Sequence, residues 1–168
     1  MSQTVLSGLP AHIDGNCRVL VLGSMPGAAS LQEQQYYAHP RNRFWPLMEA
    51  LFAVPAQAPY PARMHALQQA GVGVWDVLAH CQRPGSLDAA IVRGSEVVNP
   101  LAQLLPALPQ LRAVGCNGAT AAQAFARWVR PALPASWPVP VHALPSTSPA
   151  NAAWSTARLL QAWQVLAD

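Results

Sequence analysis

Four short apolar runs recur along this chain, and helical patterns separate them. The runs are rich in valine and leucine, as buried strands are; they are Cys17–Leu22, Val72–Leu78, Leu111–Cys116 and Val139–Leu144. The segments with helical spacing or helix start and stop signals are Phe44–Ala53, Pro61–Ala70, Asn99–Leu108, Asn117–Val129 and Ala152–Leu166. Strands that alternate with helices predict an α/β domain built around a mainly parallel sheet.

The composition fits one domain of this kind. The chain has 168 residues, of which 52% are hydrophobic and only 10% are charged, whereas a soluble domain carries about 25% charged residues. This excludes an intrinsically disordered chain and argues against a coiled coil. No apolar run approaches the roughly 18 residues of a membrane span, and no secretion signal opens the chain. We therefore expect a single domain over residues 1–168, cytoplasmic and without a membrane partner.

The basic residues are all arginines. The net charge is +3, and the chain has ten arginines and no lysine. Arginine forks match phosphate groups, although so small an excess does not by itself establish nucleic-acid binding. Without lysine there is no side-chain amine for a Schiff base, a pyridoxal cofactor or a Walker-type phosphate loop. The three cysteines lie far apart without metal-ligand spacing, so we expect neither a metal nor a cofactor.

Polar loops follow three of the predicted strands, and sites in parallel sheets form beyond the carboxyl ends of strands. Gly23–Ser30 offers backbone N–H groups to an anion or a carbonyl oxygen. Asn117 precedes a glycine and either makes a turn or lines the edge of a pocket. The hydroxyls and amide of Pro145–Asn151 either cap the next helix or hold a phosphate at its N-terminus.

The stretch Tyr36–Trp45 concentrates four aromatic residues, two arginines, a histidine and an asparagine within ten residues. Aromatic faces stack on nucleobases, and arginines meet phosphates. Phe44 and Trp45 are expected to begin the core face of a helix, but Tyr36, Tyr37 and Asn42 precede that helix or lie at its start. The stretch therefore favours a nucleic-acid ligand.

Taken together, these segments resemble the uracil-DNA glycosylase superfamily, and within it the branch of hypoxanthine-DNA (DNA-deoxyinosine) glycosylases. The resemblance spans the chain from Cys17 to the last helix, and the motifs that carry it are LGSMPG, QQYYAHPRNRFW, WDV and PSTSPAN, in that order. It implies a three-layer α/β/α sandwich around a four-stranded parallel sheet. It also implies a monomeric DNA repair enzyme of base excision repair, whose partner is DNA containing deaminated bases, hypoxanthine most of all.

The resemblance also implies roles for individual residues. The first loop lines the base pocket, Tyr37 stacks on the flipped base, and the last loop grips DNA and enters the minor groove. With Asn117 at the pocket edge, the predicted base-binding residues are Gly23, Ser24, Met25, Pro26, Gly27, Tyr37 and Asn117. The predicted DNA-binding residues are Arg41, Ser146, Thr147, Ser148 and Asn151.

The chain departs from the wider superfamily at two positions. Met25 stands where many relatives carry an asparagine or aspartate that positions the attacking water, and Leu144 stands where some carry a histidine. In the resembling branch the catalytic candidate is the amide of the HPRN segment, which is Asn42 here. An amide is a poor base, so its expected role is to orient a water by its carbonyl oxygen.

Other interpretations stay open at this stage. The same fold can prefer uracil or mismatched bases. Because Met25 cannot hold the water, a non-catalytic nucleic-acid-binding module is a second alternative. A nucleotide-binding α/β protein is a third, against which the aromatic and arginine-rich stretch argues. Asp76 either contacts water or base, or has a purely structural role. Finally, the lack of lysine predicts a monofunctional glycosylase that leaves an abasic site, because strand cutting usually needs an amine nucleophile.

Overall fold

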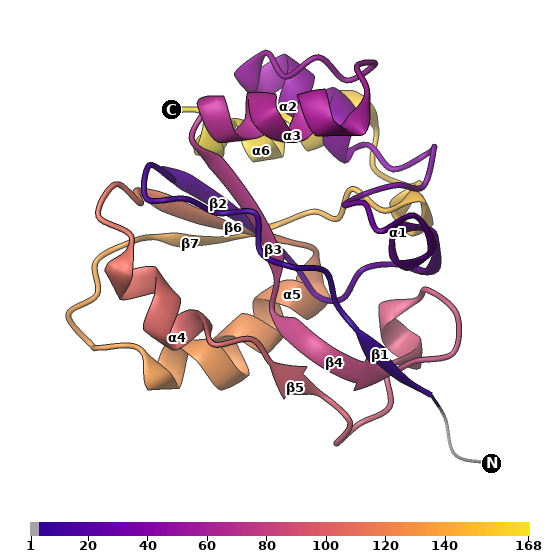
Figure 1. Ribbon diagram of the computed structural model, residues 1–168, viewed down its shortest axis with the longest axis vertical. Helices are drawn as coiled ribbons and strands as arrows, with labels where there is room; N and C mark the ends of the chain where they lie inside the picture. Colours follow the sequence, from indigo (N-terminus) through magenta and orange to yellow (C-terminus); the bar gives the residue numbers. More distant parts are fainter. Residues whose placement is uncertain (1–3) are drawn as a thin grey trace.

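The computed structural model describes residues 4–168, and its centre is a four-stranded parallel sheet (Figure 1). The strand order is β3-β2-β6-β7, and every neighbouring pair is parallel. The bounds are β2 Val19–Gly23, β3 Val72–Asp76, β6 Ala113–Asn117 and β7 Val141–Leu144. Each predicted apolar run supplies one of these strands, so the predicted sheet is confirmed.

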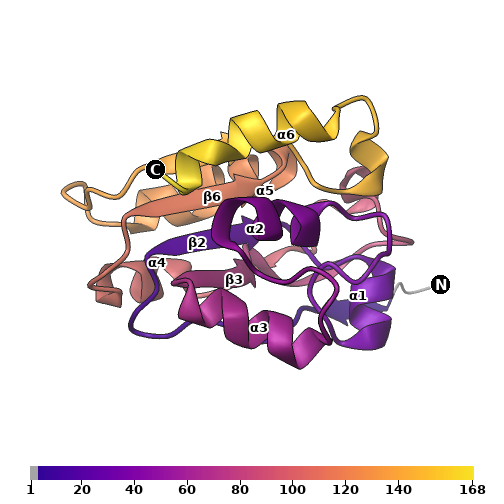
Figure 2. The same ribbon diagram turned by 90° about the horizontal axis from the view of Figure 1, so that it is seen from above.

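Helices cover both faces of this sheet. On one face lie α2 (Phe44–Phe52), α3 (Tyr60–Gln69) and α6 (Thr156–Trp163), and on the other lie α4 (Leu101–Leu104) and α5 (Ala119–Ala124) (Figures 1 and 2). Successive side chains of a strand point to opposite faces. Accordingly Val19 and Val21 pack under the first group of helices, whereas Leu20 and Leu22 pack under the second. The three-layer α/β/α sandwich is thereby confirmed.

A second, antiparallel sheet was not predicted. Its order is β1-β4-β5, with β1 Val5–Ser7, β4 Leu78–Gln82 and β5 Val97–Val98. Its strands are short and mostly mixed in polarity, so they carry little periodic signal. Between β3 and β4 the chain turns at Val77, where the N–H groups of Val77 and Leu78 donate to the carbonyls of Gly23 and Ser24 at 2.8 and 3.0 Å. The second sheet therefore begins directly against the first loop.

Three local predictions need correction. The first loop is shorter than Gly23–Ser30, because α1 (Ala28–Glu33) begins inside it. Asn99 does not cap α4: the cap residue is Pro100, and the Asn99 amide donates instead to the Asp76 carbonyl at 2.8 Å. The last helix begins at Thr156 rather than Ala152, because Ser155 caps it.

The remaining helices are short or extend those already described. A π-helical turn over Phe125–Val129 continues α5, as the prediction of a helix to Val129 requires. Single 3₁₀ turns follow α4 and α6. Within residues 4–168, no helix is both long and apolar enough to cross a membrane.

Candidate active site at the carboxyl ends of the strands

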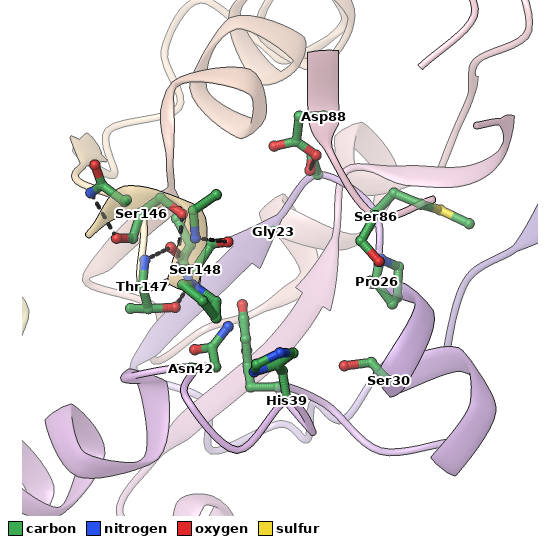
Figure 3. Close-up of a pocket in the computed structure, with 18 of the residues that line it drawn as sticks. Gly23, Pro26, Ser30, His39, Asn42, Ser86, Asp88, Ser146, Thr147 and Ser148 are labelled. Carbon is green, nitrogen blue, oxygen red and sulfur yellow. Dashed lines mark hydrogen bonds between the residues drawn. The ribbon is translucent and has the colours of Figure 1, made fainter. Parts of the chain in front are cut away.

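A cavity of about 850 Å³ lies where the four parallel strands end. The last residues of these strands line it, and they pair across the sheet as Gly23 with Asp76 and Asn117 with Leu144. The remaining wall comes from the segments that follow the strands: the first loop, the turn around His39, residues 86–88 and the last loop. Figure 3 shows labelled side chains from all of these segments around one open space. The predicted base-binding residues are thus brought together.

The first loop is held from behind by a buried arginine. Arg83 is only 5% exposed, and its guanidinium donates to the carbonyls of Pro26 at 2.7 Å, Gly85 at 2.8 Å and Met25 at 3.4 Å. Within residues 4–168 the N–H groups of Met25 and Gly27 donate to no protein acceptor. The loop carbonyls are thus bound by Arg83, while these two donors stay available. Sequence reasoning missed Arg83, because its partners are backbone carbonyls, which have no sequence signature.

Two carboxyl groups lie beside this loop. Asp88 accepts a hydrogen bond of 2.6 Å from the Ser24 hydroxyl. Asp76 is 4% exposed, and its Oδ2 has no hydrogen-bond partner in the described part of the chain. Burial, and then the nearby Asp88 charge, raise the pKa of Asp76 to about 7, against an opposing effect of Arg83. The cavity therefore contains a carboxyl group that exchanges a proton near neutrality.

The turn before α2 supplies both Tyr37 and Asn42. Tyr37 has φ +54°, in the left-handed region, and its ring stacks on Phe44 with a centroid separation of 4.0 Å. One face of the ring is thereby bound to the protein core. Burial and the Asp76 charge raise the pKa of Tyr37, and its hydroxyl finds no partner within residues 4–168. The Asn117 side chain lowers the pKa of Tyr37 by a smaller amount, although it makes no hydrogen bond with the hydroxyl.

Asn42 lines the cavity and also holds the start of α2. Its Oδ1 accepts the N–H of Phe44 at 2.9 Å, and its own N–H donates to the His39 carbonyl. An amide oxygen has two lone pairs, so one stays available to a water. Arg41 is exposed on the same turn, and its N–H donates to Nδ1 of His39 at 3.1 Å. The cap residue of α2 is Arg43, so Asn42 binds the first N–H of the helix from the position before the cap, and it also lines the cavity.

The last loop is fixed to the sheet through Asn117. The amide of Asn117 donates to the Thr147 hydroxyl at 3.0 Å and accepts the Thr147 N–H at 2.9 Å. Thr147 is fully buried, so its side chain positions the loop. Ser146, Ser148 and Asn151 remain partly exposed on the cavity wall, and Asn151 donates to the Ser146 carbonyl at 2.9 Å.

Sequence reasoning also missed the residues that hold the far end of this loop. The Arg43 guanidinium donates to the carbonyls of Trp154 and Asn151, and its N–H donates to the Thr147 carbonyl at 3.0 Å. Trp154 lines the cavity, and the Arg158 guanidinium lies 4.0 Å from the centre of its ring. Arg43, the last residue of the HPRNR segment, therefore links the turn before α2 to the last loop and to Trp154.

Comparison with known proteins bears on the family of this chain. Residues 10–167 match the family model of the Uracil DNA glycosylase superfamily. A protein of Methanosarcina barkeri described as a hypoxanthine DNA glycosylase is 38% identical over 112 residues, which cover 66% of this chain and 70% of that protein. A protein of Methanosarcina acetivorans with the same description is 36% identical over 117 residues, covering 69% and 73%.

A solved structure extends the likeness to the whole chain. It is a solution NMR structure from Methanosarcina acetivorans, described as a candidate uracil DNA glycosylase, with a TM-score of 0.81 and 30% sequence identity. The match covers 97% of this chain and 96% of that one. On the family model and the two relatives together, this chain belongs to the uracil DNA glycosylase superfamily.

Proposed function

We propose that this protein is a DNA glycosylase that extrudes a deaminated base, hypoxanthine above all, and hydrolyses its N-glycosidic bond. The observation that carries the proposal is the cavity, which gathers Asn42, Tyr37 and the first loop at the strand ends. Its volume of about 850 Å³ lies in the range of small-molecule sites. The two relatives described as hypoxanthine DNA glycosylases favour hypoxanthine. We further propose that the protein acts as a monomer in the cytoplasm.

The chemistry requires the cavity to stabilise opposite charges. As the bond between C1′ and the base breaks, positive charge grows on the sugar and negative charge on the base. The free N–H groups of Met25 and Gly27 suit the departing base. A water bound at the Asn42 oxygen forms the new bond to C1′, and its proton leaves with the base or to solvent. Asn42 thus acts by orientation, not by removing a proton.

The rim of the cavity suits a DNA backbone. Ser146, Ser148 and Asn151 present hydroxyls and an amide there. Arg41 is exposed on the turn that carries Asn42 and adds a guanidinium. These are groups that meet phosphates. Thr147 contributes by holding the loop in place. Trp154 and the Arg158 guanidinium stacked on it add an aromatic face and a positive charge beside the same loop.

Duplexes that differ only in one base test the proposal. Matched duplexes with deoxyinosine, deoxyuridine or deoxyxanthosine are incubated with the protein, and abasic sites are revealed by alkali. We expect release from deoxyinosine to be fastest. Faster release from deoxyuridine would move the protein to the uracil-specific alternative. Tight DNA binding without release of any base, even at high protein concentration, would instead establish the non-catalytic module.

Arg158→Ala is expected to weaken DNA binding and to lower its salt dependence. A protein that neutralises phosphates releases counterions, so affinity falls as salt rises, and loss of one contact reduces that slope by about 1. The matched control is Arg127→Ala, since Arg127 also stacks on a tryptophan, at 4.7 Å, but on the π-helical turn away from the cavity. Equal salt slopes for the two variants would show that Arg158 does not contact DNA.

A further inference from the structure

Two buried polar groups without partners converge on one spot of the cavity floor, at Gly23. A β-carbon added to Gly23 would collide with Oδ1 of Asp76 and would lie 3.5 Å from the Tyr37 hydroxyl. Oδ2 of Asp76 and the Tyr37 hydroxyl are both buried and have no hydrogen-bond partner in the region spanning residues 4–168. Buried polar atoms are normally paired. Both residues line the cavity, so a bound molecule can supply the missing partners.

The surroundings favour the neutral form of this carboxyl. Asp76 is 4% exposed, and Asp88 faces it with a like charge. Arg83 is the opposing cation, and its guanidinium already serves three backbone carbonyls. The hydroxyls of Tyr36 and Tyr37 are the other titratable groups near it. The backbone carbonyl of Asp76 accepts a hydrogen bond from the Asn99 amide. The side-chain carboxyl group of Asp76 remains available to a ligand.

We propose, building on the glycosylase function proposed above, that Asp76 in its protonated form recognises the base edge on which an N–H lies beside a C=O. A protonated carboxyl group has one O–H donor and one C=O acceptor. The lactam edge of hypoxanthine presents the complement, with N1–H donating and O6 accepting. The Tyr37 hydroxyl is a second partner for the same base. An ionised Asp76 would only accept, and would repel O6.

The pH dependence of single-turnover excision of deoxyinosine tests this directly. Burial raises the pKa of Asp76 to about 7, and the neutral form is the active one. The wild-type rate should therefore fall by about tenfold from pH 6 to pH 8. Asp76→Asn keeps a donor and an acceptor but does not titrate, so its rate should be flat over this range. A flat profile in this variant also separates Asp76 from His39, the imidazole on the cavity wall.

A modified substrate and a matched variant sharpen the test. A duplex with 1-methyldeoxyinosine lacks N1–H and should react at least about 100-fold more slowly, because a site built for an N–H rejects the analogue without it. Tyr37→Phe, which keeps the ring stacked on Phe44, should lower the rate on deoxyinosine. Glu33→Gln removes an exposed carboxylate of α1 and should keep the wild-type pH profile.

Each contrary result has a definite meaning. A wild-type rate that rises from pH 6 to pH 8 would make Asp76 an ionised base and overturn its role as a recognition group. Asp76 would also lose its role as a recognition group if the wild-type rate does not change with pH. The same holds if folded Asp76→Asn shows the decrease in rate from pH 6 to pH 8 that is expected of the wild type. In all three cases the protein still releases hypoxanthine, so the proposed function stands. If the wild-type protein releases no deaminated base at any pH, the proposed function itself fails.

Discussion

Asn42→Ala should lower the single-turnover rate of deoxyinosine excision by about 10²–10³, the usual cost of losing one positioned polar group in an active site. DNA affinity should change little, because the ground state does not need the oriented water. The variant also loses the hydrogen bond from Phe44 N–H to Oδ1. Loss of a side-chain hydrogen bond at the start of a helix costs about 1 kcal/mol of unfolding free energy, which is too little to explain the loss of rate in a folded protein.

Ser155→Ala is the matched control for that loss of a hydrogen bond at a helix start. The Ser155 hydroxyl accepts the Arg158 N–H at 3.1 Å at the start of α6, so the variant loses a comparable cap outside the cavity wall. We expect a similar small fall in melting temperature and a wild-type excision rate. A stable Asn42→Ala protein that binds DNA and excises at the wild-type rate would end the catalytic assignment of Asn42.

Arg83→Ala should be strongly destabilising and should also slow excision. Hydrogen bonds to a charged group contribute about 1.5–3 kcal/mol, and buried carbonyls left without donors add to the loss. Arg83 serves three carbonyls, so we expect the unfolding free energy to fall by about 3 kcal/mol and the melting temperature by about 10 °C. Because two of these carbonyls belong to Met25 and Pro26, the first loop also loses its support.

Thermal and urea unfolding of Arg83→Ala and Arg93→Ala give the comparison. Arg93 is exposed on the segment that follows, so its removal should change stability by no more than about 0.5 kcal/mol. If the two variants unfold alike, Arg83 does not hold the first loop. If Arg83→Ala is destabilised but excises at the wild-type rate below its melting temperature, the loop keeps its shape without the guanidinium.

The sheet could be predicted because its signals are local. Each parallel strand lies in a short apolar run, and the two central strands, β2 and β6, are buried throughout and end at a glycine and an asparagine. The antiparallel sheet could not be predicted, because β1 and β5 have only three and two residues and depend on β4 for pairing. At Asn99 a tertiary contact overrides a local signal. Asn99 precedes a proline, as a helix cap often does, but its side-chain amide donates to the Asp76 carbonyl instead.

The candidate site was also only partly predictable from the sequence. The loops that line the cavity could be predicted because they follow strands, and parallel strands end at one edge. The convergence of Asp76 and Tyr37 on Gly23 could not be predicted, because it depends on the register that pairs Gly23 with Asp76 and on the left-handed turn at Tyr37. Arg43 and Arg83 act on backbone carbonyls of distant segments, and only the folded chain shows which carbonyls those are.

The most direct test of the glycosylase proposal is the intact mass of a deoxyinosine-containing strand after incubation of its duplex with the protein. Hydrolysis at C1′ replaces hypoxanthine by a hydroxyl and leaves the strand unbroken, and the free base appears in equal amount. With no lysine in the chain, borohydride should trap no covalent adduct. An unchanged mass under conditions where the protein is folded and binds the duplex would contradict the proposal. A strand cleaved before alkali, with a trapped adduct, would contradict simple hydrolysis.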